Sequence, residues 1–347
     1  MPKKKEQKHR MKHGRGLLIA ALTVFCLALL VITLLRRQAP PIHEEVRIYV
    51  PTGSSYESLV DSLDVHNCIV NRNVFNLFAH TRGLSSHVKS GSYLITPGST
   101  LIGLVQKLYH GNQDAIRITI NKHRTPEQLC QYLDSRLELS ADDLLELMQS
   151  DSACASYGET PASIIGLFVQ NTYEVYWNIS PTALLNRMSK ESQHFWAPRQ
   201  QQLESLGLTR QQVLTIASIV EEETNAIEEK PDIASVYLNR LRIRMPLQAD
   251  PTVKYAVGDF TIRRIKGSML EHPSPYNTYN HAGLPPGPIC IPSESSINAV
   301  LENKKTGYLY FCAKEDFSGR HNFSSSLAEH SSNARKFHKA LNNKNIH

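Results

Sequence analysis

The chain has 347 residues, of which 41% are hydrophobic and 20% charged, and its formal net charge is +6. This length is sufficient for two folded domains with hydrophobic cores, and the composition excludes an intrinsically disordered chain. The charge lies at one end: residues 1–16 hold seven Lys or Arg and one Glu, a net of +6, whereas the other 31 basic and 31 acidic residues cancel. Because the rest of the chain is neutral, we expect no nucleic-acid partner.

A stretch of nineteen residues without a charge, Leu17 to Leu35, follows the basic tail. As a helix it would span roughly 28 Å, the thickness of the hydrocarbon core of a bilayer. The preceding basic residues predict a cytoplasmic N-terminus. The alternative is a cleaved signal peptide, which needs a shorter apolar core and small residues at the cleavage site, whereas "RRQAPPIHEE" follows. We predict a cytoplasmic tail (1–16), one transmembrane helix (17–35) and a linker (36–45).

Short strand and helix patterns alternate between residues 46 and 114. "VRIYV" has the pattern of a strand, and an amphipathic helix is predicted to begin near Ser55. "NRNVFNLFAHTRG" predicts a second helix. Another strand precedes a helix that Ser99 or Thr100 caps and Gly111 ends. Since no acid–base pair or metal-ligand cluster lies in this region, we expect a binding or positioning module.

The second region, residues 115–347, begins with the strand-like "AIRITI". Helical patterns, an extended aromatic segment "TYEVYWNIS" and a helical stretch from residue 181 to about 226 follow. Short strands and loops continue to "YLYFCA", and a basic helix ends the chain. Strands and helices are mixed without a regular βαβ order, so we predict the α+β fold class.

Three consecutive glutamates end the helical run "IASIVEEETNA". Thr209 is the predicted N-cap of this helix, with Gln212 at position N3. Steps of 100° per residue place Glu222 opposite the apolar face, in water, and Glu221 and Glu223 at the two edges of that face. An edge position suits a general acid, because partial desolvation raises the pKa of a glutamate. The alternative is a solvated helix end without function, and from the residues alone both edge glutamates remain candidates.

Two polar segments that contain aromatic residues follow the glutamates. We expect "MPLQADPTVKY" to be a Pro-broken loop after a helix, and "PSPYNTYNHAGLPPGPICIP" to be a long loop. Amide and hydroxyl groups match sugar hydroxyls, and tyrosine rings pack on sugar rings, so the two segments predict a groove for a hydroxyl-rich polymer. The candidate substrate-binding residues are Asn239, Gln248, Asp250, Thr252, Tyr276, Asn277 and Tyr279.

The ordered set "ASIVEEET", "ASVYLNRLRIRMPLQADPTVKYAVG", "YNTYNHAGLPPGPI" and "YLYFCA" resembles the MltG/YceG family of endolytic murein transglycosylases along essentially the whole chain. The resemblance implies a LysM-like domain at 46–114 and a lytic transglycosylase catalytic domain at 115–347. The family's catalytic glutamate precedes the Thr of an E-x-E-T motif, which corresponds to Glu223, with Glu221 as the runner-up. One departure is "VQNTY", where Gln170-Asn171 replaces the family's Pro-Asp.

The resemblance further implies cleavage of the MurNAc–GlcNAc β-1,4 bond inside nascent peptidoglycan strands, leaving 1,6-anhydro-MurNAc ends. Glu223 would act first as the acid and then as the base. The implied location is the inner membrane with a periplasmic catalytic domain, and the implied partners are peptidoglycan strands, the membrane and wall synthases. We expect no cofactor and no metal, since neither HExxH nor a zinc-site Cys/His spacing occurs. The alternatives are a non-catalytic peptidoglycan-binding scaffold and a muramidase, for which Asp250 is the candidate second carboxylate.

Overall fold

The computed structural model describes residues 18–26, 29, 33, 42–262, 264–265 and 267–343. Over these residues, no helix combines the length and the apolar composition that crossing a membrane requires. The predicted span at 17–35 lies partly outside the described residues, and the part inside them, residues 18–26, 29 and 33, is helical. The membrane span therefore stays a prediction.

The chain divides into two compact units. The first contains Met1–Ile116 and Val175–Asn178, and the second contains Arg117–Glu174 and Ile179–His347. The elements of the first unit are β1 (Val46–Val50), α2 (Tyr56–Val65), α3 (Arg72–Thr81), η1 (Leu84–Ser86), β2 (Gly91–Ile95) and α4 (Leu101–His110).

The local signals of the first unit act as the sequence predicts. Strands β1 and β2 pair antiparallel, with Val46 opposite Ile95. The side chains of Ser55 and Thr100 cap α2 and α4, and Gly111 ends α4 in the left-handed conformation, with φ of 71°. One apolar cluster fills the space between the strands and helices. The LysM-like character of this unit stays a prediction.

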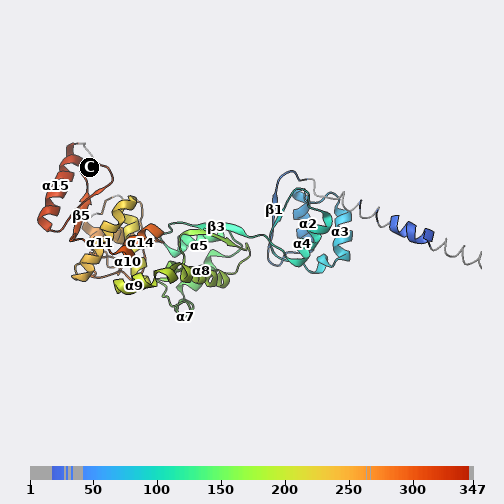
Figure 1. Cartoon of the computed structure of the whole chain (residues 1–347), viewed down its shortest axis with the longest axis horizontal. Coiled ribbons are helices and arrows are strands. Elements are labelled where there is room, and N and C mark those ends of the chain that lie inside the picture. The colour runs from blue at the N-terminus through green and yellow to red at the C-terminus, as the bar shows by residue number, and fades with distance from the viewer. Residues whose placement is uncertain are drawn as a thin grey trace, which may run out of the picture. The chain divides into compact units, whose positions relative to one another are not determined.

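The second unit combines helices with two pairs of short strands. Its elements are β3 (Ile116–Ile120), α5 (Pro126–Asp134), α6 (Ala141–Gln149), α7 (Asp151–Ala155), η2 (Ile164–Leu167), β4 (Asn171–Val175), α8 (Pro181–Trp196), η3 (Ala197–Arg199), α9 (Gln200–Leu206), α10 (Arg210–Glu223), η4 (Ile227–Glu229), α11 (Lys230–Arg242), α12 (Asp250–Val257), α13 (Gly267–Leu270), α14 (Glu294–Glu302), β5 (Tyr310–Ala313), β6 (His321–Ser324) and α15 (Leu327–Asn343). Strand β3 pairs with β4, and β5 pairs with β6 (Figure 1). The predicted α+β class is confirmed.

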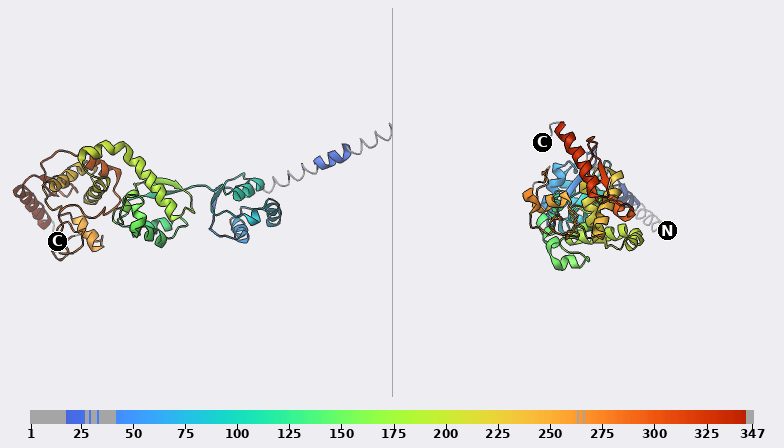
Figure 2. Two further views of the ribbon diagram at one scale, coloured as in Figure 1. Left: turned by 90° about the horizontal axis from the view of Figure 1, so that it is seen from below. Right: turned by 90° about the vertical axis from the view of Figure 1, so that its left-hand side faces the viewer.

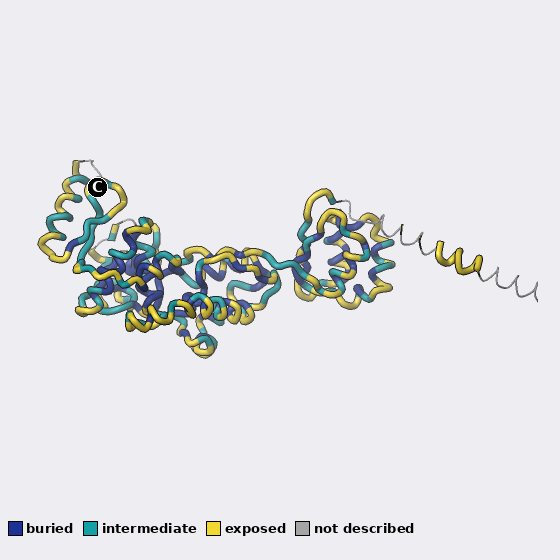
Figure 3. The backbone as a smooth tube through the Cα atoms, viewed as in Figure 1, coloured by how far each residue is buried: buried dark blue, intermediate teal, exposed yellow. Residues whose placement is uncertain are grey.

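Helix α10 forms the centre of the second unit. It begins as predicted: Thr209 and Gln212 form a capping box with both of its hydrogen bonds present. Every residue from Val213 to Val220 is buried, and α11 and α14 pack against the helix. Figure 3 shows buried backbone concentrated in this region. The C-terminal end of α10, with its glutamates, is therefore held by a rigid core.

The predicted helical stretch from residue 181 consists of three helices, which are separated by η3 and by Gly207; Gly207 ends α9 with φ of 69°. One expectation about element boundaries was wrong. Asp250 and Thr252 lie on α12 rather than in a loop. Pro251 is compatible with this helix because the first turn leaves its N–H groups unpaired, so a proline there loses no hydrogen bond.

The long loop at residues 271–293 contains no helix or strand, as expected. Its glycine-rich part passes very close to another segment of the chain. A Cβ atom on Gly287 would lie 2.0 Å from the carbonyl oxygen of Ala162. Only glycine permits this approach between the loop and the segment that precedes η2.

Candidate active site

A pocket of ≈ 340 Å³ opens where α10 ends. It combines carboxylates, one guanidinium group, amide and hydroxyl groups and several aromatic rings. Its lining residues are Glu223, Tyr237, Arg240, Leu247, Gln248, Asp250, Tyr279, Tyr310, Phe311, Leu327 and His330.

Glu223 is the last residue of α10 and is partly buried. The hydroxyl of Tyr237 donates a hydrogen bond to its Oε1 at 2.5 Å. Burial raises the pKa of Glu223 to about 7, the Tyr237 hydrogen bond opposes this rise, and the charge of Asp250 adds to it. A carboxyl with this pKa is close to half protonated at neutral pH, so it can both donate and accept a proton.

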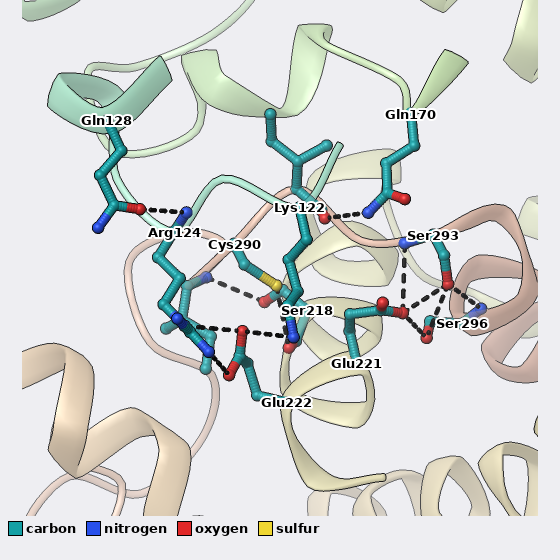
Figure 4. Close-up of polar contacts among 12 residues, drawn as sticks. Lys122, Arg124, Gln128, Gln170, Ser218, Glu221, Glu222, Cys290, Ser293 and Ser296 are labelled. Atoms are coloured by element: carbon teal, nitrogen blue, oxygen red, sulfur yellow. Dashed lines mark hydrogen bonds and ion pairs between the residues drawn. The ribbon is translucent and has the colours of Figure 1, made fainter. Parts of the chain in front are cut away.

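Several hydrogen bonds hold the carboxylate of Glu221 in place (Figure 4). Its Oε2 accepts hydrogen bonds from the hydroxyls of Ser293 and Ser296, both at 2.5 Å, and from Lys230 Nζ at 2.9 Å. Burial raises the pKa of Glu221, but these three hydrogen bonds outweigh it and leave the pKa below the ordinary value. Glu221 therefore stays ionised at neutral pH and anchors the start of α14.

Glu222 does not lie in water, so this prediction was wrong. Its two oxygens accept hydrogen bonds from Arg124 Nε and Nη2, each at 3.0 Å, and Lys122 Nζ lies 3.3 Å away. Its side chain is only 13% exposed. The segment between β3 and α5 carries both cations across this face of α10 (Figure 4). Helix periodicity gives the direction of a side chain but not the distant segment that covers it.

Three of the predicted substrate-binding residues line the pocket: Gln248, Asp250 and Tyr279. The hydroxyl of Tyr279 donates to Asp250 Oδ1 at 2.6 Å, which links the long loop to the first turn of α12. Gln248 has a positive φ of 49°, and its N–H donates to the carbonyl of Thr278 at 3.1 Å. The two predicted segments therefore meet at one wall of the pocket.

The other four predicted residues are not brought to the pocket lining. Thr252 and Asn277 are 0% exposed, and their side chains donate to backbone carbonyls. The amide of Asn239 donates to two backbone carbonyls ahead of β5. Tyr276 packs on Tyr255 with a centroid distance of 4.6 Å. These side chains hold the segments that surround the pocket.

Most of the remaining pocket lining was not predicted from the sequence. Tyr237 and Arg240 lie three residues apart, on one face of α11, and this spacing could have pointed to both. Tyr310 and His330 come from β5 and α15. No local pattern in the sequence links these elements to α10.

Gln170, at which the sequence departs from the Pro-Asp motif that the resemblance leads us to expect, makes a structural hydrogen bond. Its side-chain amide donates to the carbonyl of Ile291 at 2.7 Å (Figure 4). This hydrogen bond ties the start of β4 to the loop that precedes α14. The neighbouring Asn171 is exposed.

Residues 48–336 match the model of the YceG-like family. The chain belongs to the YceG-like family. A protein from Bacillus subtilis (strain 168), named endolytic murein transglycosylase, is 29% identical over 315 residues, which cover 86% of each protein. A protein of the same name from Streptococcus pneumoniae serotype 2 (strain D39 / NCTC 7466) is 26% identical over 298 residues, which cover 77% of this chain and 54% of the relative. The chain thus spans about half the length of the streptococcal relative.

The fold is shared with a solved member of the YceG-like family. The crystal structure of a YceG-like protein from Listeria monocytogenes is 29% identical and superposes with a TM-score of 0.56. The match covers 83% of this chain and 99% of that protein.

Proposed function

We propose that this YceG-like protein is an endolytic murein transglycosylase. It cleaves the MurNAc–GlcNAc β-1,4 bond within nascent peptidoglycan strands and leaves 1,6-anhydro-MurNAc ends. The main support for the proposal is Glu223, a carboxyl group in the pocket whose pKa is raised to about 7 by burial. The names of the related proteins support the substrate class.

The proposed reaction needs one carboxyl group and no water. Protonated Glu223 donates its proton to the glycosidic oxygen while the bond to the MurNAc anomeric carbon breaks. The resulting carboxylate takes the proton of the C6 hydroxyl, whose oxygen then bonds to the anomeric carbon. The reaction consumes no water or other reactant, and Glu223 ends the cycle with its proton restored.

Tyr237 supports this cycle at its charged stage. Its hydroxyl donates to Glu223 Oε1, so it stabilises the carboxylate that exists after the first proton transfer. Glu221 is poorly suited to the same role, because its hydrogen bonds with Lys230 and the two serines stabilise the ionised form.

The chemistry of the pocket walls supports a glycan as the ligand. Gln248 and Tyr279 offer amide and hydroxyl groups, and Tyr310 and Phe311 offer rings on which a pyranose can pack. In this proposal the pocket binds the glycan strand at an internal bond, so that the strand continues on both sides of the bond that is cleaved.

A hydrolase is the second candidate, because Asp250 lies in the same pocket as Glu223. A muramidase uses a second carboxylate as a nucleophile or as a base for water. In the transglycosylase, Asp250 instead accepts the Tyr279 hydrogen bond and positions the loop. The two mechanisms give products that differ by one water.

Mass spectrometry of the products separates the candidates. Purified glycan strands are digested with the wild-type protein and with Asp250→Asn. We expect anhydro ends from both, with a reduced rate in the variant. Reducing ends from the wild type, or loss of all cleavage only in Asp250→Asn, would indicate a hydrolase, and binding without any cleavage by the wild type would indicate a scaffold.

We further propose that the predicted helix at 17–35 anchors the protein in the inner membrane, with the active site in the periplasm. The linker would then tether the chain to the membrane at which new strands and the synthases that make them lie.

A further inference from the structure

The C-terminal helix supplies part of the pocket wall. Helix α15 lies alongside the hairpin of β5 and β6 (Figures 1 and 2). Two of its residues, Leu327 and His330, line the pocket together with Glu223. Their spacing of three residues places them on one face of the helix. Leu327 is 61% exposed, which leaves its apolar side chain open to a ligand.

The ring of His330 is held in place by an aromatic neighbour. It stacks on Tyr310 with a centroid distance of 5.3 Å and an interplanar angle of 24°. Tyr310 in turn lies beneath the guanidinium group of Arg240, 5.4 Å from its ring centroid. The imidazole thus has a fixed orientation in the wall of the pocket.

The Nδ1 atom of His330 is buried and has no hydrogen-bond partner among the described residues. The same holds for Oγ of Ser324, which lies directly opposite Tyr310 in the β5–β6 register. Opposite residues of an antiparallel pair project from the same face, so Ser324 and Tyr310 share the face on which His330 stacks. Buried polar atoms without a partner are rare, so this part of the pocket wall has hydrogen-bonding capacity that the described residues leave unused.

The protonation state of His330 suits a neutral, hydroxyl-bearing ligand. Burial lowers the pKa of His330, and the positive charge of Arg240 lowers it further. The imidazole is therefore neutral at physiological pH, with one nitrogen that donates and one that accepts. A sugar hydroxyl both donates and accepts, so it can pair with an imidazole nitrogen in either tautomer.

We propose that His330 binds the glycan in the Glu223 pocket through a hydrogen bond between its imidazole and a sugar hydroxyl. Leu327 covers the apolar side of the same sugar. The C-terminal helix is thus part of the substrate-binding site and fixes the position of the glycan relative to Glu223. This inference rests on the proposed function, because it assumes that the ligand is a glycan.

The test removes the ring nitrogens while it keeps an aromatic ring. His330→Phe retains the stacking on Tyr310 and removes both nitrogens, and His330→Asn returns an amide in place of the imidazole. The matched control is His338→Phe, the same change at an exposed position of α15 outside the pocket lining. We expect His330→Phe to lower kcat/KM on glycan strands about tenfold, mainly through KM. His330→Asn should recover part of this loss, and His338→Phe should match the wild type.

A binding measurement separates this inference from the proposed function. Glycan strands freed of stem peptides are titrated into Glu223→Gln and into the double variant Glu223→Gln/His330→Phe. We expect about tenfold weaker binding by the double variant. If both proteins bind equally and His330→Phe cleaves like the wild type, the inference is overturned while the proposed function stands. If the wild type does not cleave but His330 still strengthens binding, the proposed function fails and the binding role remains. Melting temperatures of all variants establish that each is folded.

Discussion

At the residue scale, three neighbouring glutamates have the same side chain and three different environments. Glu221 accepts hydrogen bonds from a lysine and two hydroxyls, and Glu222 pairs with two cations. Glu223 has one neutral hydrogen-bond donor, Tyr237, and a buried position. The environment of Glu221 stabilises a carboxylate, whereas that of Glu223 favours a carboxyl group that exchanges its proton near neutral pH.

The pKa of Glu223 predicts the alkaline limb of the pH–rate profile. Its reactive form is protonated, so kcat/KM should fall as the pH rises through about 7. The Tyr237 hydrogen bond lowers this pKa, so Tyr237→Phe should move the limb to higher pH and also lower the maximal rate. Initial rates on glycan strands across the pH range measure both effects. A limb that stays in place in Tyr237→Phe would mean that another group controls it.

The contribution of Glu223 to the stability of the folded protein should change with pH in the opposite direction from that of most carboxylates. Its pKa rises from 4.5 to about 7 on folding, so the native state binds the proton more tightly than the unfolded state, and stability falls as the pH rises between these values. Above about pH 7 the buried charge costs about 3 kcal/mol. We expect Glu223→Gln to be more stable than the wild type by up to this amount near pH 8, and by little near pH 4. Urea unfolding at several pH values measures the difference, and a pH-independent difference would contradict the assigned pKa.

At the element scale, Glu221 joins α10 to the start of α14. Its hydrogen bonds reach Ser293, the N-cap of α14, and Lys230, the first residue of α11. A single carboxylate thus joins α10, α11 and α14.

Glu221→Gln should therefore destabilise the protein, in contrast to Glu223→Gln. It leaves Lys230, 6% exposed in its side chain, without its counter-charge, and we expect a loss of about 2 kcal/mol near neutral pH. Because the folded-state pKa of Glu221 is depressed, the difference from wild type should shrink as the pH falls below the ordinary glutamate pKa. Chemical denaturation measures this, with the exposed Glu204→Gln as the matched control. Equal stability of Glu221→Gln and the wild type would exclude an anchoring role.

Elements with local signals could be predicted from the sequence, and those set by distant contacts could not. The cap at Thr209 and the end of α4 at Gly111 follow from adjacent residues. The helical state of Asp250 depends on the hydrogen bonds that hold α12 against the long loop. Glu223 and the Gln248 loop were found from pattern and resemblance. His330 was not, because it lies on α15, far along the chain from Glu223, and it meets the pocket only in the folded structure, where α15 packs on the β5–β6 hairpin.

At the scale of the whole molecule, the proposed location is tested by removing the predicted span. The full chain should sediment with membranes and resist extraction by salt, whereas a chain lacking residues 1–41 should be recovered in the soluble fraction. The shortened chain should cleave purified glycan strands as before, because the pocket lies wholly within the second unit. Salt-extractable full-length protein would contradict a transmembrane anchor.

The proton that Glu223 carries is central to the proposed reaction, and one side-by-side digestion tests its role. Wild type, Glu223→Gln and Glu204→Gln are incubated with the same purified glycan strands near neutral pH, and the new ends are counted by mass spectrometry. We predict 1,6-anhydro ends from the wild type and Glu204→Gln, and at least a hundredfold fewer, as an order of magnitude for loss of a general acid, from Glu223→Gln. Undiminished cleavage by a folded Glu223→Gln would contradict the assignment.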